Sequence, residues 1–197
     1  MNLAGSYLYK DILAYSDIKK PQVLDKLLRA LAFQMGSEVK YTELAGIIGI
    51  NKDTVQKYID ILEKSYVIFR LESFSRNRRN EIKHSRKVYF YDNGIRNTII
   101  GDFKPLSLRQ DKGALWENFI VSEKLKQNKY RNTFARMYFW RSTTKQEIDL
   151  IEEKDGKIYA YEIKWRSKKA KFPLSFTSFY DAECQEINRE NFQDYIT

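Results

Sequence analysis

The chain has 197 residues, 43% of them hydrophobic and 15% aromatic, which is enough apolar material for the cores of one or two domains. Its 35 basic residues exceed its 26 acidic ones, which indicates a polyanionic partner; by charge alone, DNA and a membrane surface suit equally. The single cysteine excludes an internal disulfide, and no apolar run approaches the roughly 18 residues of a membrane span, so we expect a cytoplasmic protein with no membrane partner.

The first predicted elements are helices. Apolar residues recur at helical spacing over residues 23–35, directly after Pro21, and predict an amphipathic helix. Two short helices are predicted next, with Thr42 and Asn51 as N-caps and Gly49 in the tight turn between them. This spacing is typical of a helix-turn-helix.

The outward face of the second short helix bears on DNA binding. Lys52 and Lys57 lie on this face and are candidate phosphate contacts. Asp53 and Asp60 share the face, which is unusual for a helix that reads the major groove. Docking within the chain or onto a protein partner therefore stays open beside DNA binding.

A basic wing is predicted between two strands, at residues 66–71 and 87–91. The segment between them has far more basic than acidic residues and could lie across a phosphate backbone, releasing condensed counterions. The candidate nucleic-acid contacts of this segment are Arg76, Arg78, Arg79, Lys83 and Arg86.

A hairpin near the C-terminal end gathers three charged groups. Asp155-Gly156 between two apolar-containing runs predicts a two-residue type I′ turn, because this turn needs positive φ at both central residues. That register places Asp149 opposite Glu162, and strand alternation points Lys164 the same way as Glu162.

Two interpretations of these charges stay open. Opposed carboxylates are destabilising unless a cation lies between them, and Mg²⁺ or Mn²⁺ would meet that need. Alternatively, Lys164 neutralises both acids in an ordinary surface salt-bridge patch. Both strands carry apolar residues on both faces, which is typical of covered strands and favours a cleft.

An acid on one strand followed by Glu-x-Lys on the next resembles the PD-(D/E)xK nuclease superfamily, here as Asp149 and Glu162-Ile163-Lys164. These enzymes commonly carry a further acid on the preceding helix, and the match here is Glu117. The resemblance implies that Asp149, Glu162 and Glu117 hold Mg²⁺ or Mn²⁺, while Lys164 orients or activates the attacking water.

Four segments resemble one narrower family of bacterial and archaeal proteins: residues 7–13, 54–63, 87–96 and 147–150. In that family an AAA-type ATPase module precedes a winged-helix segment and a domain of unknown function with the nuclease-like fold. The chain contains no Gly-x-x-x-x-Gly-Lys-Ser/Thr phosphate loop, so no nucleotide site is carried over. The resemblance implies an ATPase partner, normally in the same polypeptide. Whether the chain is a portion of such a protein or a natural relative without its motor stays open.

We therefore predict an α+β protein with a helical winged-helix domain over residues 1–105 and a PD-(D/E)xK nuclease-like mixed sheet flanked by helices over residues 106–197. A second basic run that includes Lys168 and Lys169 follows the Glu-x-Lys strand. Its placement suits holding nucleic acid over the metal, and an ordinary solvated loop stays open as the alternative. The predicted function is DNA binding with a Mg²⁺-dependent phosphodiester-cleaving site. The alternative is a catalytically inactive nuclease-fold module, used for DNA binding or assembly beside an ATPase; either is compatible with an oligomer.

Overall fold

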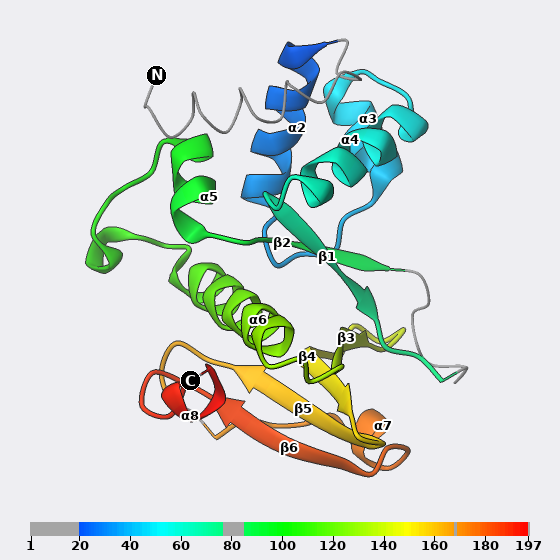
Figure 1. Ribbon diagram of the computed structural model, residues 1–197, viewed down its shortest axis with the longest axis vertical. Coiled ribbons are helices and arrows are strands. Elements are labelled where there is room, and N and C mark those ends of the chain that lie inside the picture. Colours follow the sequence, from blue (N-terminus) through cyan, green and yellow to red (C-terminus); the bar gives the residue numbers. More distant parts are fainter. Residues whose placement is uncertain (1–19, 77–84, 168, 197) are drawn as a thin grey trace. The chain divides into compact units, whose positions relative to one another are not determined.

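The computed structural model describes residues 20–76, 85–167 and 169–196. It forms two compact units, Met1–Arg70 with Arg86–Arg109 and Leu71–Ser85 with Gln110–Thr197. The described elements are a mixture of helices and one mixed sheet, so the predicted α+β class is confirmed (Figure 1). Strand β1 (Ile68–Ser73) begins in the N-terminal unit and ends in the C-terminal unit.

The N-terminal unit is mainly helical. Its elements are α2 (Pro21–Phe33), α3 (Tyr41–Ile48), α4 (Lys52–Lys64), the first part of β1, β2 (Arg86–Phe90), α5 (Asn93–Ile100) and the 3₁₀ turn η1 (Leu106–Leu108). The prediction of a first amphipathic helix is confirmed, since α2 starts at Pro21 and buries one stripe that includes Leu24, Leu28 and Leu31. α2 packs against α3 and α5 (Figure 1).

The tight turn between α3 and α4 forms as predicted, whereas the start of α3 differs from the prediction. Gly49 ends α3 in the left-handed region with φ 77°, and the Asn51 side chain caps α4 by accepting from Thr54 N–H at 2.7 Å. The prediction of Thr42 as an N-cap is wrong, because α3 already begins at Tyr41, whose ring is buried. Burial of that ring overrides the local capping preference.

Both strands predicted for the wing are present with shifted bounds. β1 starts at Ile68 because Tyr66, at φ 55°, closes the turn after α4 and cannot be extended. The two strands are neighbours in the sheet, whose order is β2-β1-β3-β4-β5-β6.

The C-terminal unit is built on the other four strands. Its elements are α6 (Lys112–Tyr130), β3 (Arg136–Arg141), β4 (Glu147–Lys154), β5 (Lys157–Ile163), α7 (Leu174–Thr177), β6 (Ala182–Ile187) and α8 (Gln193–Ile196). β3, β4 and β5 are antiparallel, while the end of β1 joins β3 in parallel and β6 joins β5 in parallel. α6 lies over β5 and beside α8 (Figure 1).

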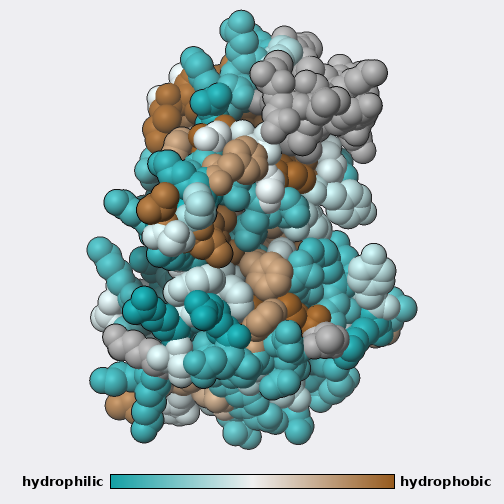
Figure 2. Space-filling view, turned by 90° about the vertical axis from the view of Figure 1, so that its left-hand side faces the viewer, coloured by the Kyte–Doolittle hydropathy of each residue, from teal (hydrophilic) through white to brown (hydrophobic). Residues whose placement is uncertain are grey.

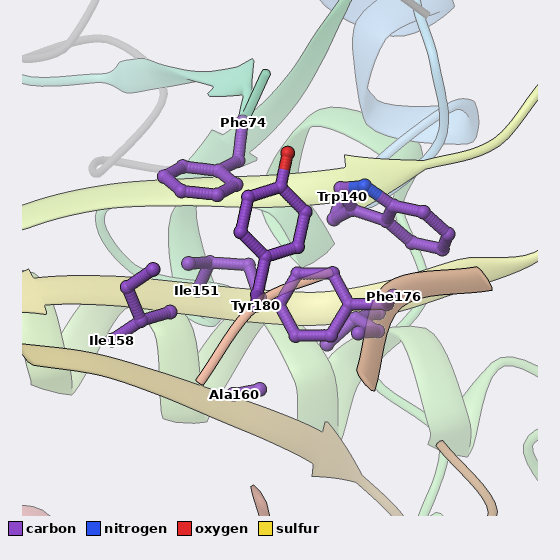
Figure 3. Packing of buried hydrophobic residues seen from close by; sticks show 8 residues of the cluster. Phe74, Trp140, Ile151, Ile158, Ala160, Phe176 and Tyr180 are labelled. Atoms are coloured by element: carbon purple, nitrogen blue, oxygen red, sulfur yellow. The ribbon is translucent and has the colours of Figure 1, made fainter. Parts of the chain in front are cut away.

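One face of this sheet carries an aromatic core. Figure 3 shows Phe74, Trp140, Phe176 and Tyr180 packed over the aliphatic side chains of β4 and β5. The Trp140 and Phe176 rings are 5.2 Å apart, and the Phe74 and Tyr180 rings are also 5.2 Å apart. Phe74 directly follows β1. The end of this strand therefore gives the C-terminal unit both a strand partner for β3 and a core residue.

Much of the surface drawn in Figure 2 is polar. On the face drawn in Figure 2, hydrophobic side chains form separate patches within a hydrophilic surface. Large apolar side chains that remain exposed include Phe103, Leu108, Phe134 and Leu174. Across the described ranges, none of the helices combines the length and the apolar character required to cross a bilayer.

Candidate functional site

The β4–β5 hairpin has the predicted turn and register. Asp155 and Gly156 have φ values of 52° and 76°, as a type I′ turn requires, and the residues on either side of them pair. The same register continues to the Leu150–Tyr161 pair. The next residues outward are Asp149 and Glu162, so the prediction that they lie on adjacent antiparallel strands is confirmed.

A β-bulge interrupts β4 next to the candidate site. Tyr138 of β3 pairs with Ile151, whereas Trp140 pairs with Ile148, so β4 has one residue more than β3 over this interval. Asp149 lies within the bulge. Nothing in the local sequence pattern marks the extra residue, so the bulge could not be predicted.

The Asp149 side chain completes the strand pairing at this point. Its Oδ2 accepts a hydrogen bond from the backbone N–H of Ile163 at 2.8 Å. The regular β4–β5 pairs end at Leu150, so a carboxylate oxygen replaces a main-chain acceptor. This bond fixes the position of the Asp149 carboxylate relative to the end of β5.

Lys164 joins the two carboxylates. Its Nζ lies 3.3 Å from Asp149 Oδ2 and 2.6 Å from Glu162 Oε2. The Asp149 and Glu162 side chains are 13% and 9% exposed, whereas that of Lys164 is 41% exposed. The acids therefore form the inner part of the site, and the ammonium lies toward solvent.

The electrostatics of the site follow from this arrangement. Burial and the neighbouring charge of Asp149 raise the pKa of Glu162 to about 7, against the opposing effect of Lys164. Burial alone would lower the pKa of Lys164, but the two carboxylates outweigh it and raise that pKa to about 12. The ammonium is thus charged at neutral pH, while Glu162 is poised between its two protonation states.

Two further acids lie near Glu162, and neither was among the site residues predicted from the sequence. Glu147, at the start of β4, raises the pKa of Glu162 further and is 3.6 Å from Arg141. Its position two residues before Asp149 could have pointed to it. Glu186 on β6 is the strand partner of Glu162, but this pairing depends on a parallel strand that the sequence did not reveal.

Glu117 lies on α6 and is half-buried beside the buried Trp116 and Leu115. In the described portion of the chain, no three Asp, Glu, His or Cys side chains are grouped as a metal site would need. The structure therefore brings Asp149, Glu162 and Lys164 together and does not add a third acid as a ligand. The metal site that includes Glu117 stays a prediction.

Two of the predicted wing contacts have partners within the protein. Arg76 forms an ion pair with Glu153 at 2.7 Å, and its guanidinium lies 5.8 Å from the centre of the Phe74 ring. The Arg86 guanidinium lies 5.6 Å from the centre of the Tyr41 ring. Both therefore have local structural roles beside any contact with phosphate.

The other predicted nucleic-acid contacts fall into two groups. Lys52 and Lys57 are exposed on α4, and Lys169 is exposed after β5. Asp53 and Asp60 line the same surface depression as Lys57, so this face has mixed charge. Arg78, Arg79, Lys83 and Lys168 lie outside the described residues.

The known proteins that are similar to this chain are longer than it is. Uncharacterised proteins of Mycobacterium tuberculosis and Mycobacterium bovis are each 30% identical over 136 residues, which are 68% of this chain and 30% of the relative. An uncharacterised protein of Haemophilus influenzae is 23% identical over 167 residues, 80% of this chain and 38% of the relative. The chain thus spans less than two fifths of the length of these relatives. No solved structure matches it.

Two family models match successive parts of the chain. Residues 112–194 match a domain of unknown function, DUF4143, and this match includes β4, β5 and the candidate site. Residues 2–106 match another domain of unknown function, DUF8612, over slightly more than half of the chain. The chain belongs to the family defined by this DUF8612 domain and continues into a DUF4143 domain.

Proposed function

We propose that this protein binds DNA and cleaves phosphodiester bonds at a divalent-metal site of the PD-(D/E)xK type. One observation carries the proposal: Asp149 and Glu162, from adjacent strands, both contact the ammonium of Lys164. These are the residue types of the superfamily motif, in its order and on the expected strands. Because both acids are buried, they require more neutralising positive charge than a pair of acids at the surface would.

The donor set fits Mg²⁺ or Mn²⁺. Asp149 and Glu162 supply carboxylate oxygens, which hard divalent cations prefer, and Glu117 is the further ligand that the resemblance implies. The raised pKa of Glu162 supports the fit, because a cation would relieve the repulsion from Asp149. When bound there, the metal would polarise a phosphate oxygen and lower the pKa of water.

The protein's own groups have separate tasks in this proposal. The Ile163 N–H holds the Asp149 carboxylate in place, so one ligand is positioned before any metal arrives. Lys164 is protonated at neutral pH and has no free lone pair, so it donates hydrogen bonds to water or to phosphate and does not act as a base. Its charge stabilises the negative charge that develops on phosphorus oxygens in the transition state.

DNA binding is proposed for the N-terminal unit. The order α3, tight turn, α4, then β1 and β2 agrees with a winged helix, and the segment joining the two strands is rich in arginine and lysine. Contacts to phosphate by these side chains would position the duplex without reading its sequence. The family resemblance and the greater length of the relatives support an AAA-type ATPase module as the partner of both units.

A second candidate function is a catalytically inactive module for DNA binding or assembly. It is favoured by the contacts of Lys164, which already neutralises part of the charge of both carboxylates. A salt bridge between buried acids and a partly exposed lysine can serve the fold alone. The two candidates differ in whether Asp149 and Glu162 hold a metal.

A cleavage assay separates them. The wild-type chain would be incubated with single-stranded, duplex and branched DNA and with RNA, in Mg²⁺, in Mn²⁺ and in EDTA, at high protein concentration. We expect metal-dependent cleavage of at least one substrate, and loss of cleavage in Glu162→Gln, which keeps the shape of the side chain. If the wild type cleaves none of them, or the variant cleaves equally fast, the nuclease proposal fails and the inactive module replaces it.

A further inference from the structure

A polar pocket lies on the face of the C-terminal sheet that α6 covers. It has a volume of about 260 Å³ and is lined by residues of α6, β4, β5, β6 and α8. Tyr161 lines it, while the next residue, Glu162, belongs to the candidate nuclease site. Because consecutive strand residues point to opposite faces, the Tyr161 and Glu162 side chains leave β5 on opposite sides.

The inner wall of the pocket is formed by the buried carboxylate of Glu152, and each of its two oxygens has a donor partner within the protein. Glu152 is 4% exposed, and its Oε1 accepts from Asn128 Nδ2 at 2.5 Å. Its Oε2 lies 3.2 Å from Lys124 Nζ and accepts from the Tyr161 hydroxyl at 3.4 Å. Burial, followed by the charge of Glu152, raises the pKa of Tyr161, so this hydroxyl remains a donor at neutral pH.

Lys124 is a buried group of the pocket whose hydrogen-bonding capacity is only partly used. It is 8% exposed, and an ammonium carries three N–H donors. Among residues that the structure describes, its charged partner is Glu152, and its other contact is the face of the Tyr161 ring at 5.4 Å. Buried donors of this kind normally have acceptors, so the remaining N–H groups require an acceptor from water or from a ligand in the pocket.

The rim adds positive charge. Lys154 and Arg131 line the pocket, and Asp194 is the acid that lines it beside Glu152. With Lys124, three basic groups face two acidic ones, so the pocket has a positive balance. Tyr159 and Gln185 also line it and bring further polar groups toward the same space.

We propose that this pocket binds a small phosphomonoester, with the phosphate held by Lys124 and Lys154. Lysine ammonium groups bind phosphate as point charges, and the neighbouring donors can complete its hydrogen bonding. A cavity of about 260 Å³ is slightly smaller than typical ligand sites, which begin at about 300 Å³, and this favours a ligand no larger than a nucleoside monophosphate. The proposal is independent of the nuclease proposal, since it uses none of the same residues.

Isothermal titration calorimetry on the full chain in EDTA tests the proposal. The probes are inorganic phosphate, AMP and the uncharged control adenosine. We expect both phosphate-bearing probes to bind and adenosine not to bind; tighter binding of AMP than of phosphate would show that the pocket also accepts the organic part. Removing the metal keeps the nuclease site from contributing a signal.

Charge variants locate the binding. Lys154→Gln removes a rim charge and should weaken phosphate or AMP binding about five- to tenfold, while Asp194→Asn removes a repelling charge and should tighten it severalfold. Lys157→Gln is the matched control, because Lys157 belongs to the same hairpin, does not line the pocket and pairs with Glu183. It should leave the affinity unchanged.

Three results would overturn the proposal. These are no binding of either phosphate probe up to about 10 mM, equal binding of adenosine and AMP, and equal weakening by Lys154→Gln and Lys157→Gln. The double variant Lys124→Met with Glu152→Gln should abolish binding without leaving an unpaired buried charge. If the double variant does not fold, the Lys154→Gln and Asp194→Asn pair still decides the outcome.

Discussion

The Oδ2 of Asp149 accepts from the backbone N–H of Ile163 at 2.8 Å and lies 3.3 Å from the ammonium of Lys164. A single carboxylate oxygen thus completes the pairing of β4 with β5 and also contributes to the candidate site. The regular β4–β5 pairs end at Leu150, next to the bulge in β4, so the Asp149 side chain supplies the acceptor at this position. Stability and activity are therefore separable by the choice of substitution at Asp149.

Asp149→Asn should abolish metal-dependent cleavage but retain most of the stability. The amide oxygen can still accept from Ile163 N–H, whereas Asp149→Ala leaves that donor unpaired and should cost about 1–3 kcal/mol. Urea denaturation of both variants, in EDTA, measures the difference. Equal destabilisation by Asn and Ala would contradict a hydrogen-bonding role for this side chain.

Lys164→Met should lower the cleavage rate on the order of 10²–10³-fold at saturating Mg²⁺, since it removes one electrostatic contact to the reacting phosphate. Metal affinity, measured by calorimetry, should not weaken, because the ammonium competes with a cation for both carboxylates. Lys171→Met, in an exposed lysine of the following basic run, is the control. A variant that loses metal binding together with turnover would show that Lys164 supports the site structurally instead.

The stability of the metal-free protein should depend on pH through Glu162. Its pKa rises from 4.5 in the unfolded chain to about 7 in the fold, so the protonated form favours folding. That contribution is complete below pH 4.5 and is lost as pH rises to about 7, at a rate on the order of 1 kcal/mol per pH unit. Glu162→Gln does not titrate and should gain stability relative to wild type between pH 5 and pH 8 in EDTA. Parallel stability curves for the two proteins would refute the shift.

The wing should dominate DNA affinity. Replacing Arg76, Arg78, Arg79 and Lys83 together by Ala should weaken duplex binding uniformly across sequences. It should also flatten the salt dependence by about 0.9 in log–log slope per lost phosphate contact. Fluorescence anisotropy over a salt series measures this, with Lys52→Ala/Lys57→Ala testing α4 separately. Unchanged binding in the fourfold variant would assign the wing to another partner.

Phe74→Ala should destabilise the C-terminal unit by about 3–5 kcal/mol, as expected for truncation of a buried aromatic side chain. Phe74 is 4% exposed and packs against the rings of Tyr138 and Tyr180. Phe134→Ala, at a position 93% exposed, is the matched control and should have little effect. Similar denaturation midpoints for the two variants would argue against the aromatic core.

Features that depend on a few neighbouring residues could be predicted from the sequence. The hairpin register follows from the backbone demands of Asp155-Gly156, and the start of α4 follows from the capping side chain of Asn51. The start of α3 could not be predicted in the same way, because the burial of Tyr41 decides it. Local chemistry determines an element when no distant packing opposes it.

The candidate nuclease site and the polar pocket differ in the same way in how far the sequence could predict them. Asp149, Glu162 and Lys164 come together across one short turn, so their proximity could be read from spacing. The pocket could not, since Lys124 on α6 meets Glu152 on β4 only after the helix has packed on the sheet. Glu186 near Glu162 likewise depends on the parallel pairing of β6 with β5, which no local pattern encodes.

The end of β1 also constrains how this chain could have evolved. Residues Leu71–Ser85 group with the C-terminal unit, yet they lie inside the segment that matches the N-terminal family. Glu72 and Ser73 pair with β3, and Phe74 N–H bonds to Phe139 at 2.6 Å. A gene rearrangement that joined a new partner at residue 107 would leave β3 with an open edge and a gap in the aromatic core. Recombination at this boundary is therefore disfavoured, and we expect the two family segments to be inherited as one piece.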